Sequence, residues 1–206
     1  MEPVLGAGGV IVPHETFMPG IRALCDKYGI LLVSDEVITG FGRTGDWSGA
    51  RHWKVKPDMM TCAKAITSAY YPFGATMIGE KVAEVFENDE TGAASIGHGY
   101  TYSAHPVGAA AAIACLNETK RMELNINAKE RGAQIFDAVN QLKNKYDIIG
   151  DVRGGHGLMT ALEFVSDQTS KTPLDNASMA KIQKTAYENG AFVRVGCAVG
   201  GVALGL

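Results

Sequence analysis

Lys64 is the residue whose type and setting most directly suggest chemistry. It follows the apolar run 59–63 and has small or hydroxylic neighbours such as Thr61, Ala65 and Thr67. A lysine amine that is partly desolvated becomes a nucleophile and can form a Schiff base with a carbonyl compound. A lone lysine at the end of a strand more often extends its ammonium group into solvent without a catalytic role. Lys64 alone therefore leaves both interpretations open.

Asp35 favours the catalytic interpretation of Lys64, because it comes after a second apolar run, 30–33. Alone, an aspartate in this position is more often the cap of a turn or helix. A carboxylate beside a pyridine nitrogen, however, keeps that nitrogen protonated and makes the ring an electron sink. An acid and a lysine that end two buried strands of one sheet can face opposite edges of one flat cofactor. The pair Asp35 and Lys64 therefore favours chemistry based on pyridoxal 5'-phosphate (PLP).

The first half of the sequence has the pattern of an α/β sheet that would position these two residues. Residues 16–28 show helical spacing of apolar side chains, and Gly29 is a plausible stop. Short apolar runs with branched side chains are typical of strands in a buried, parallel sheet. Three such runs predict strands at 30–33, 59–63 and 75–78.

The second half has a different pattern. A helix of small residues is predicted from Pro106 to about residue 123, with proline suited to its first turn. The remaining predictions are an amphipathic helix at 128–146, a glycine-rich turn after Gly150, a strand at 158–165, a helix at 177–189 and a last strand at 191–195. This change places a domain boundary between residues 117 and 125.

Four segments of the chain resemble the class III aminotransferases. They are SDEVITGFGRTG (34–45), PDMMTCAK (57–64), HGYTYSAHP (98–106) and VRGGHGLM (152–159). The resemblance implies the PLP-dependent transferase fold type I, an α/β fold. Residues 1–120 would form the carboxyl-terminal part of the large domain with its parallel-rich sheet, and residues 121–206 an α+β small domain. We expect the chain to be a fragment, since the segments that the family places before this region are not in the sequence.

The resemblance also implies roles for five residues. Lys64 would hold the PLP aldehyde as a Schiff base and then move a proton between substrate and cofactor. Asp35 would bind the pyridine nitrogen, and Val37 would pack on the ring. Thr101 would bind the cofactor phosphate across the interface of a homodimer. Arg194 would recognise a substrate carboxylate, a role that suits its planar guanidinium, although an exposed structural arginine is as good an interpretation.

The implied reaction is transamination between an amine or ω-amino acid and a keto acid such as pyruvate. The residues after the first segment look most similar to the ω-amino-acid:pyruvate aminotransferases. A class III aminomutase or a PLP decarboxylase would share Asp35 and Lys64, and an inactive truncated scaffold is a third alternative. The isolated fragment is expected to lack turnover.

Composition favours a globular enzyme and argues against other classes of function. The formal net charge of −3 and the scattered basic residues do not indicate a nucleic-acid partner. No apolar run is long enough to predict a membrane span. The spacing of Cys25, Cys62, Cys115 and Cys197 predicts neither a metal site nor disulfides, and reduced thiols suggest a cytoplasmic protein.

Overall fold

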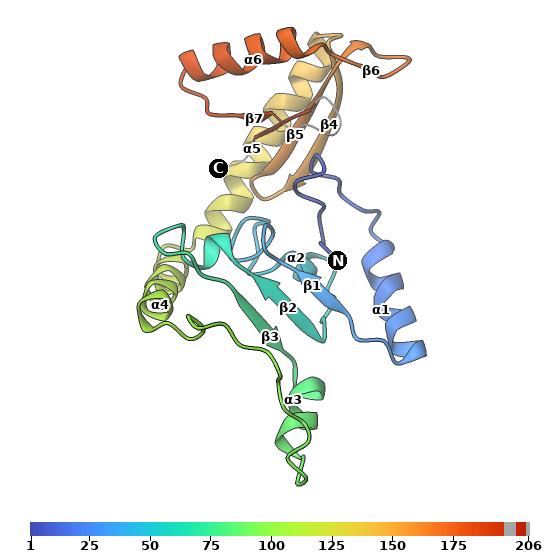
Figure 1. Cartoon of the computed structure of the whole chain (residues 1–206). Coiled ribbons are helices and arrows are strands. Elements are labelled where there is room, and N and C mark those ends of the chain that lie inside the picture. The colour runs from blue at the N-terminus through green and yellow to red at the C-terminus, as the bar shows by residue number, and fades with distance from the viewer. Residues whose placement is uncertain (196–200, 205–206) are drawn as a thin grey trace.

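The chain folds around two separate β-sheets, as the computed structural model in Figure 1 shows for residues 1–195 and 201–204. The first half contains α1 (Phe17–Tyr28), β1 (Val33–Asp35), α2 (Gly49–His52), β2 (Met59–Cys62), η1 (Lys64–Ile66), β3 (Ala75–Ile78), α3 (Glu80–Glu87) and α4 (Pro106–Arg121). The second half contains α5 (Leu124–Lys145), β4 (Ile149–His156), β5 (Met159–Asp167), β6 (Thr172–Pro173), α6 (Asn176–Glu188), β7 (Arg194–Val195) and β8 (Gly201–Leu204).

The first sheet has the strand order β1-β2-β3, with β1 and β2 parallel and β3 antiparallel to β2. The strands predicted at 59–63 and 75–78 are confirmed. The strand predicted at 30–33 begins only at Val33, and Ile30 and Leu31 are exposed. The connection from β2 to β3 contains only the single 3-10 turn η1 and no α-helix of the kind that usually returns the chain to a parallel strand, in keeping with the antiparallel direction of β3.

An ion pair and a backbone hydrogen bond align β1 with β2. Arg22 on α1 donates to Asp58 over 2.8 Å, and the same carboxylate oxygen accepts the Leu32 N–H over 2.7 Å. The hydrogen bond from Leu32, followed by the one from Arg22, lowers the pKa of Asp58. The α1 helix therefore sets the start of the parallel pair through Asp58.

The second sheet is antiparallel, in the order β4-β5-β8-β7, with β6 paired to β5. The α5 helix packs against it through the buried residues Val139, Ile149, Val152 and Leu162. The predicted glycine-rich turn after Gly150 is wrong, because this segment is the long strand β4. A register shift between Gly154 and His156 gives β4 a bulge, and glycine tolerates such irregular backbone.

The two sheets share a hydrophobic core. The amino-terminal segment and α1 pack against β5, with Val4, Met18 and Leu32 in one buried cluster with Met159 and Ala161. In Figure 1, α5 rises from the end of α4 beside the first sheet and continues along the second sheet. The two halves are therefore held together by apolar burial as well as by the chain connection.

A cluster of aromatic rings lies at the same junction. His52 at the end of α2 lies 4.2 Å from the ring of His156 at the end of β4, and Trp53 lies 5.6 Å from His156. Burial, followed by the nearby His52, lowers the pKa of His156. The neutral imidazole is therefore the form that this junction favours.

Two glycines allow close backbone approaches at this junction. A Cβ at Gly132 on α5 would collide with the carbonyl group of Gly157, in the turn between β4 and β5. Gly157 itself has a φ of +54° and lies against the backbone of residues 43–45. The next residue, Leu158, donates its N–H to the Arg43 carbonyl over 3.0 Å.

Within the described residues, no helix is both long and apolar enough to cross a membrane. The thiols of Cys25, Cys62 and Cys115 are free. Cys197 lies outside the described residues.

The glycine contact predicts opposite effects for the same substitution in two helices. Gly132→Ala should lower the free energy of unfolding by about 1–3 kcal/mol, because the new methyl group forces the helix away from Gly157. Gly20→Ala is the matched control: Gly20 lies within α1, where a Cβ meets no atom within 4 Å. That control should gain about 0.5–1 kcal/mol from helix propensity. Denaturant unfolding of both variants tests this, and equal effects would contradict the close approach.

Candidate active site

Asp35 and Lys64 lie at the ends of two neighbouring strands. Asp35 is the last residue of β1 and stands opposite Thr61 of β2. Lys64 follows β2 after the single residue Ala63 and begins η1. Because β1 and β2 are parallel, their carboxyl ends meet at the same edge of the sheet, where α/β proteins bind ligands. The structure thus brings the predicted acid and the predicted lysine to one edge.

The Asp35 carboxylate is half-buried and oriented by its own turn. Its Oδ1 atom accepts the N–H of Val37 over 3.1 Å. Val37, the residue predicted to pack on the cofactor ring, is also half-buried and lies in the turn after β1. The backbone N–H of Asp35 donates to the carbonyl of Met1 over 2.8 Å. Asp35 is therefore fixed in the strand, and its side chain keeps acceptor capacity for another donor.

Lys64 is exposed and has an unusual backbone. Its φ of +46° lies in the left-handed region, as do those of Ser68 (+48°) and Ala69 (+63°). Such conformations cost on the order of 1–3 kcal/mol each in residues with a Cβ and cluster at functional sites. The turn is supported from below, because Ile66 and Thr67 are buried and Ile66 packs in one cluster with Ala112 of α4. The strained backbone at Lys64 is therefore followed by residues that are packed in the core.

The two charged side chains at this sheet edge are both available to a ligand. Within residues 1–195 and 201–204, neither Asp35 nor Lys64 forms an ion pair, with the other or with any third residue. A carboxylate and an ammonium group on adjacent strand ends would ordinarily attract one another. Since both remain uncommitted, the carboxylate can receive a pyridinium N–H while the amine reaches a carbonyl carbon. The donor set matches PLP.

Glu36, to which the sequence analysis assigned no role, is the most deeply buried acid of the site, with 1% of its surface exposed. Its carboxylate accepts four hydrogen bonds, from the hydroxyls of Ser34 and Thr39 and from the backbone N–H groups of Gly49 and Ala50. The signal in the sequence was an acid flanked by hydroxyl residues directly after a predicted buried strand.

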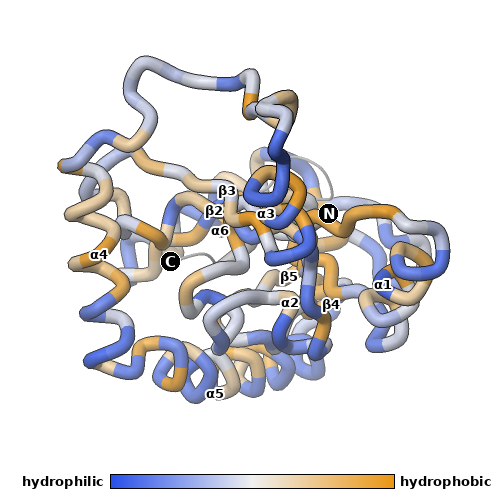
Figure 2. Tube along the Cα trace, turned by 90° about the horizontal axis from the view of Figure 1, so that it is seen from below, coloured by the Kyte–Doolittle hydropathy of each residue, from blue (hydrophilic) through white to orange (hydrophobic). Residues whose placement is uncertain are grey.

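Thr101 lies in the long connection between α3 and α4, which arches away from the rest of the chain in Figure 2. Thr101 is exposed, and so are Tyr100 and Tyr102 on either side of it, at 73% and 80%. His105 ends this connection and stacks on Tyr71 with 5.4 Å between ring centres. In the described part of the chain, no hydrogen bond joins Thr101 to Asp35 or Lys64.

Arg194 is exposed at the start of β7 in the second sheet. Its neighbours along the chain differ in burial, with Val193 buried and Phe192 73% exposed. None of the ion pairs among the described residues involves Arg194. The structure therefore places Arg194 apart from the first sheet, with its guanidinium available to an anion.

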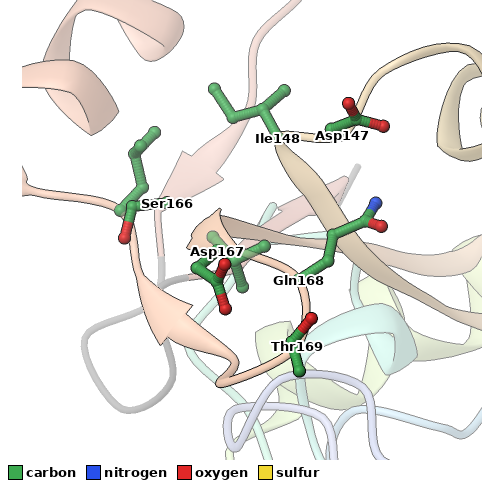
Figure 3. Close-up of a pocket in the computed structure, with 8 residues that line it drawn as sticks. Asp147, Ile148, Ser166, Asp167, Gln168 and Thr169 are labelled. Carbon is green, nitrogen blue, oxygen red and sulfur yellow. The ribbon is translucent and has the colours of Figure 1, made fainter.

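A hollow of about 700 Å³ lies on the second sheet, away from these residues (Figure 3). It is lined by Asp147, Ile148, Val165, Ser166, Asp167, Gln168, Thr169 and Leu174. The Asp167 carboxylate already accepts the N–H and hydroxyl of Ser170, which lowers its pKa. This hollow contains no predicted site residue and no uncommitted pair like Asp35 and Lys64.

Comparison with known proteins identifies related chains. The chain is 46% identical over 198 residues to an uncharacterised aminotransferase of Sinorhizobium fredii, covering 94% of this chain and 42% of the relative. It is 42% identical to the diaminobutyrate–2-oxoglutarate transaminase of Halomonas elongata (84% and 37% covered). It is 36% identical to the taurine–pyruvate aminotransferase of Bilophila wadsworthia (94% and 42% covered).

A solved structure is similar over almost the whole chain. It is an amine transaminase from an uncultivated Pseudomonas species in its PLP-bound form, with a TM-score of 0.91 and 44% identity. The match covers 98% of this chain and 46% of that one. The chain thus spans less than half the length of the relatives that it matches.

The family model of the class-III aminotransferases matches residues 1–198. That match covers the first sheet, the second sheet apart from β8, and every element that positions Asp35 and Lys64. The chain therefore belongs to the class-III aminotransferase family, whose cofactor is pyridoxal phosphate.

Proposed function

We propose that this chain is the carboxyl-terminal part of a transaminase that moves an amino group from an amine or ω-amino acid to a keto acid such as pyruvate. One observation carries the proposal: Asp35 ends β1, Lys64 begins the turn just after the parallel strand β2, and neither is committed to an ion pair among the described residues. The taurine–pyruvate relative and the amine transaminase support this substrate class. The relative that uses 2-oxoglutarate makes that keto acid the second acceptor to assay.

The residues of the chain would divide the work around the cofactor. Bound PLP supplies an electron sink for the carbanion formed at the substrate carbon. The Asp35 carboxylate would hold the proton on the ring nitrogen, and Val37 would pack on the ring face beside it. The Nζ atom of Lys64 would hold the cofactor. As a free amine it would then carry the proton between the α-carbon of the substrate and the carbonyl carbon of the cofactor.

Arg194 would bind the substrate carboxylate. Its guanidinium has no ion-pair partner in the described part of the chain, and its planar fork suits bidentate recognition of a carboxylate. This role distinguishes acidic substrates, such as the keto acid, from simple amines.

The working form would be a homodimer with shared sites. Thr101 sits in an exposed connection that carries the large exposed side chains Ile96, Tyr100 and Tyr102. A contiguous exposed apolar segment of this kind marks an interaction surface. We place the Thr101 hydroxyl on the cofactor phosphate of the second subunit. The cytoplasm is the proposed compartment, because three described thiols are free.

Replacing the acid tests the proposed chemistry. In the full-length protein, Asp35→Asn keeps the shape of the side chain but cannot hold the ring nitrogen protonated, so the rate of amine transfer to pyruvate should fall on the order of 10²–10³. The matched control is Asp137→Asn on α5, an exposed aspartate that forms no ion pair among the described residues, and it should stay within about twofold of the parent. Both variants should keep the parent's circular dichroism. An Asp35→Asn enzyme as active as the control would contradict the role of Asp35.

Mixing two inactive variants tests whether Thr101 is shared. One carries Lys64→Ala, and the other carries Thr101→Glu, whose carboxylate repels a phosphate. In a mixed dimer with shared sites, one site is doubly damaged and the other is intact, so random exchange of equal amounts should restore about one quarter of the parent activity. No recovery after subunit exchange has been verified by mass spectrometry would contradict sharing.

A further inference from the structure

The Glu36 carboxylate is buried without a basic partner in the described part of the chain. None of the ion pairs of those residues includes it, and only 1% of its surface is exposed. Burying an unpaired carboxylate is costly unless hydrogen bonds replace its hydration. Here each carboxylate oxygen has two donors. Oε1 accepts from Ser34 and Ala50 over 2.9 Å each, and Oε2 accepts from Thr39 and from Gly49, the latter over 2.7 Å.

These donors come from three different segments. Ser34 belongs to β1, Thr39 to the turn after it, and the Gly49 and Ala50 amides to the first turn of α2. The first amides of a helix have no partner within the helix, so an acceptor from elsewhere is required. Ser34 and Thr39 are fully buried, and Ala50 is 1% exposed. Glu36 is therefore the point at which the end of β1, its turn and α2 are joined.

The same anchor determines where Asp35 points. Successive side chains of a strand alternate between its two faces, so Ser34 and Asp35 of β1 point to opposite sides, and the Ser34 hydrogen bond holds the Glu36 carboxylate on the Ser34 side. The Glu36 backbone N–H donates to Thr61 over 2.8 Å, and its carbonyl accepts from Gly40 over 3.0 Å. These two bonds fix the backbone on either side of Glu36, and the next residue, Val37, donates the N–H that orients the Asp35 carboxylate. A shift of Glu36 would therefore move both residues proposed to contact the ring.

We infer that Glu36 is a positioning residue, which holds Asp35 and Val37 against the cofactor ring through its four hydrogen bonds to Ser34, Thr39, Gly49 and Ala50. This inference rests on the proposed function. It adds a residue that touches neither cofactor nor substrate and acts on the ring nitrogen only through Asp35.

Glu36→Gln is an informative test variant because each Glu36 oxygen faces one backbone N–H. Whichever way the amide is turned, its NH₂ group must face an N–H donor that cannot reverse its polarity. Glu36→Asp keeps the charge but shortens the reach, and it serves as the conservative variant. Glu163→Gln is the matched control, since Glu163 is a partly buried acid of β5 that pairs with Arg153 in the other sheet.

The experiment measures kcat, KM and the pH dependence of the visible absorbance of the bound cofactor in the holoenzyme. Glu36→Gln should lower kcat on the order of 10–100-fold with little change in KM, because a small displacement of a positioned group costs this much. It should also move the absorbance transition in the same direction as Asp35→Asn does. Glu36→Asp should recover part of the loss, whereas Glu163→Gln should leave the absorbance transition unchanged.

The double variant Asp35→Asn/Glu36→Gln separates positioning from a general loss of stability. Residues that act through one another are not additive, so the double variant should be no slower than Asp35→Asn alone. Additive losses, or a Glu36→Gln enzyme that is only less stable, would overturn the inference. If Glu36→Gln does not fold, the same comparisons with Glu36→Asp decide it. Absence of amine transfer in the full-length parent protein that contains this chain, or an unaffected Asp35→Asn variant of it, would instead refute the proposed function.

Discussion

The parallel pairing of β1 with β2 is the constraint on which the candidate site depends. It is a short pairing, with only three residue pairs in register, from Val33 and Met59 to Asp35 and Thr61. A shift by one residue would turn Asp35 to the opposite face of the sheet. The structure prevents such a shift at both ends of the strand, through Asp58 near its start and Glu36 just beyond its end. Two hydrogen-bonded acids therefore protect the orientation of a third.

The second sheet depends on the same region through close backbone contacts. Gly132, Gly157 and the backbone of residues 43–45 meet without intervening side chains. The segment that follows Asp35 thus leads into residues 43–45, which contact the β4–β5 turn of the second sheet. A change that shifts residues 43–45 would displace both the turn after β1 and the β4–β5 turn of the second sheet, because packed interiors transmit small displacements instead of absorbing them.

Local sequence pattern was enough to predict the strand before Lys64 and the helix ended by Gly29, because each has a strong local signal: a short, mostly apolar run in one case and a left-handed C-cap in the other. The strand that carries Asp35 was indicated but placed too early, since its predicted range 30–33 meets β1 only at Val33. The β4 strand was missed because its glycines are typical of turns. In the structure they occupy a bulge whose pairing with β5 is specified by tertiary contacts. The role of Glu36 was missed for a related reason, since two of its donors lie at residues 49 and 50, far along the chain.

Trapping the cofactor on its lysine tests the central claim most directly. The enzyme is loaded with PLP, reduced with borohydride, digested and mapped by mass spectrometry. A single phosphopyridoxyl label is expected on the peptide that contains Lys64, because among the described residues this strained lysine alone follows the carboxyl end of β2, the strand that pairs with the end of β1 at Asp35. The label should be lost in Lys64→Ala and retained in Lys54→Ala, a control at another lysine with positive φ. A label on any other lysine in the parent enzyme, with Lys64 unmodified, would contradict the account.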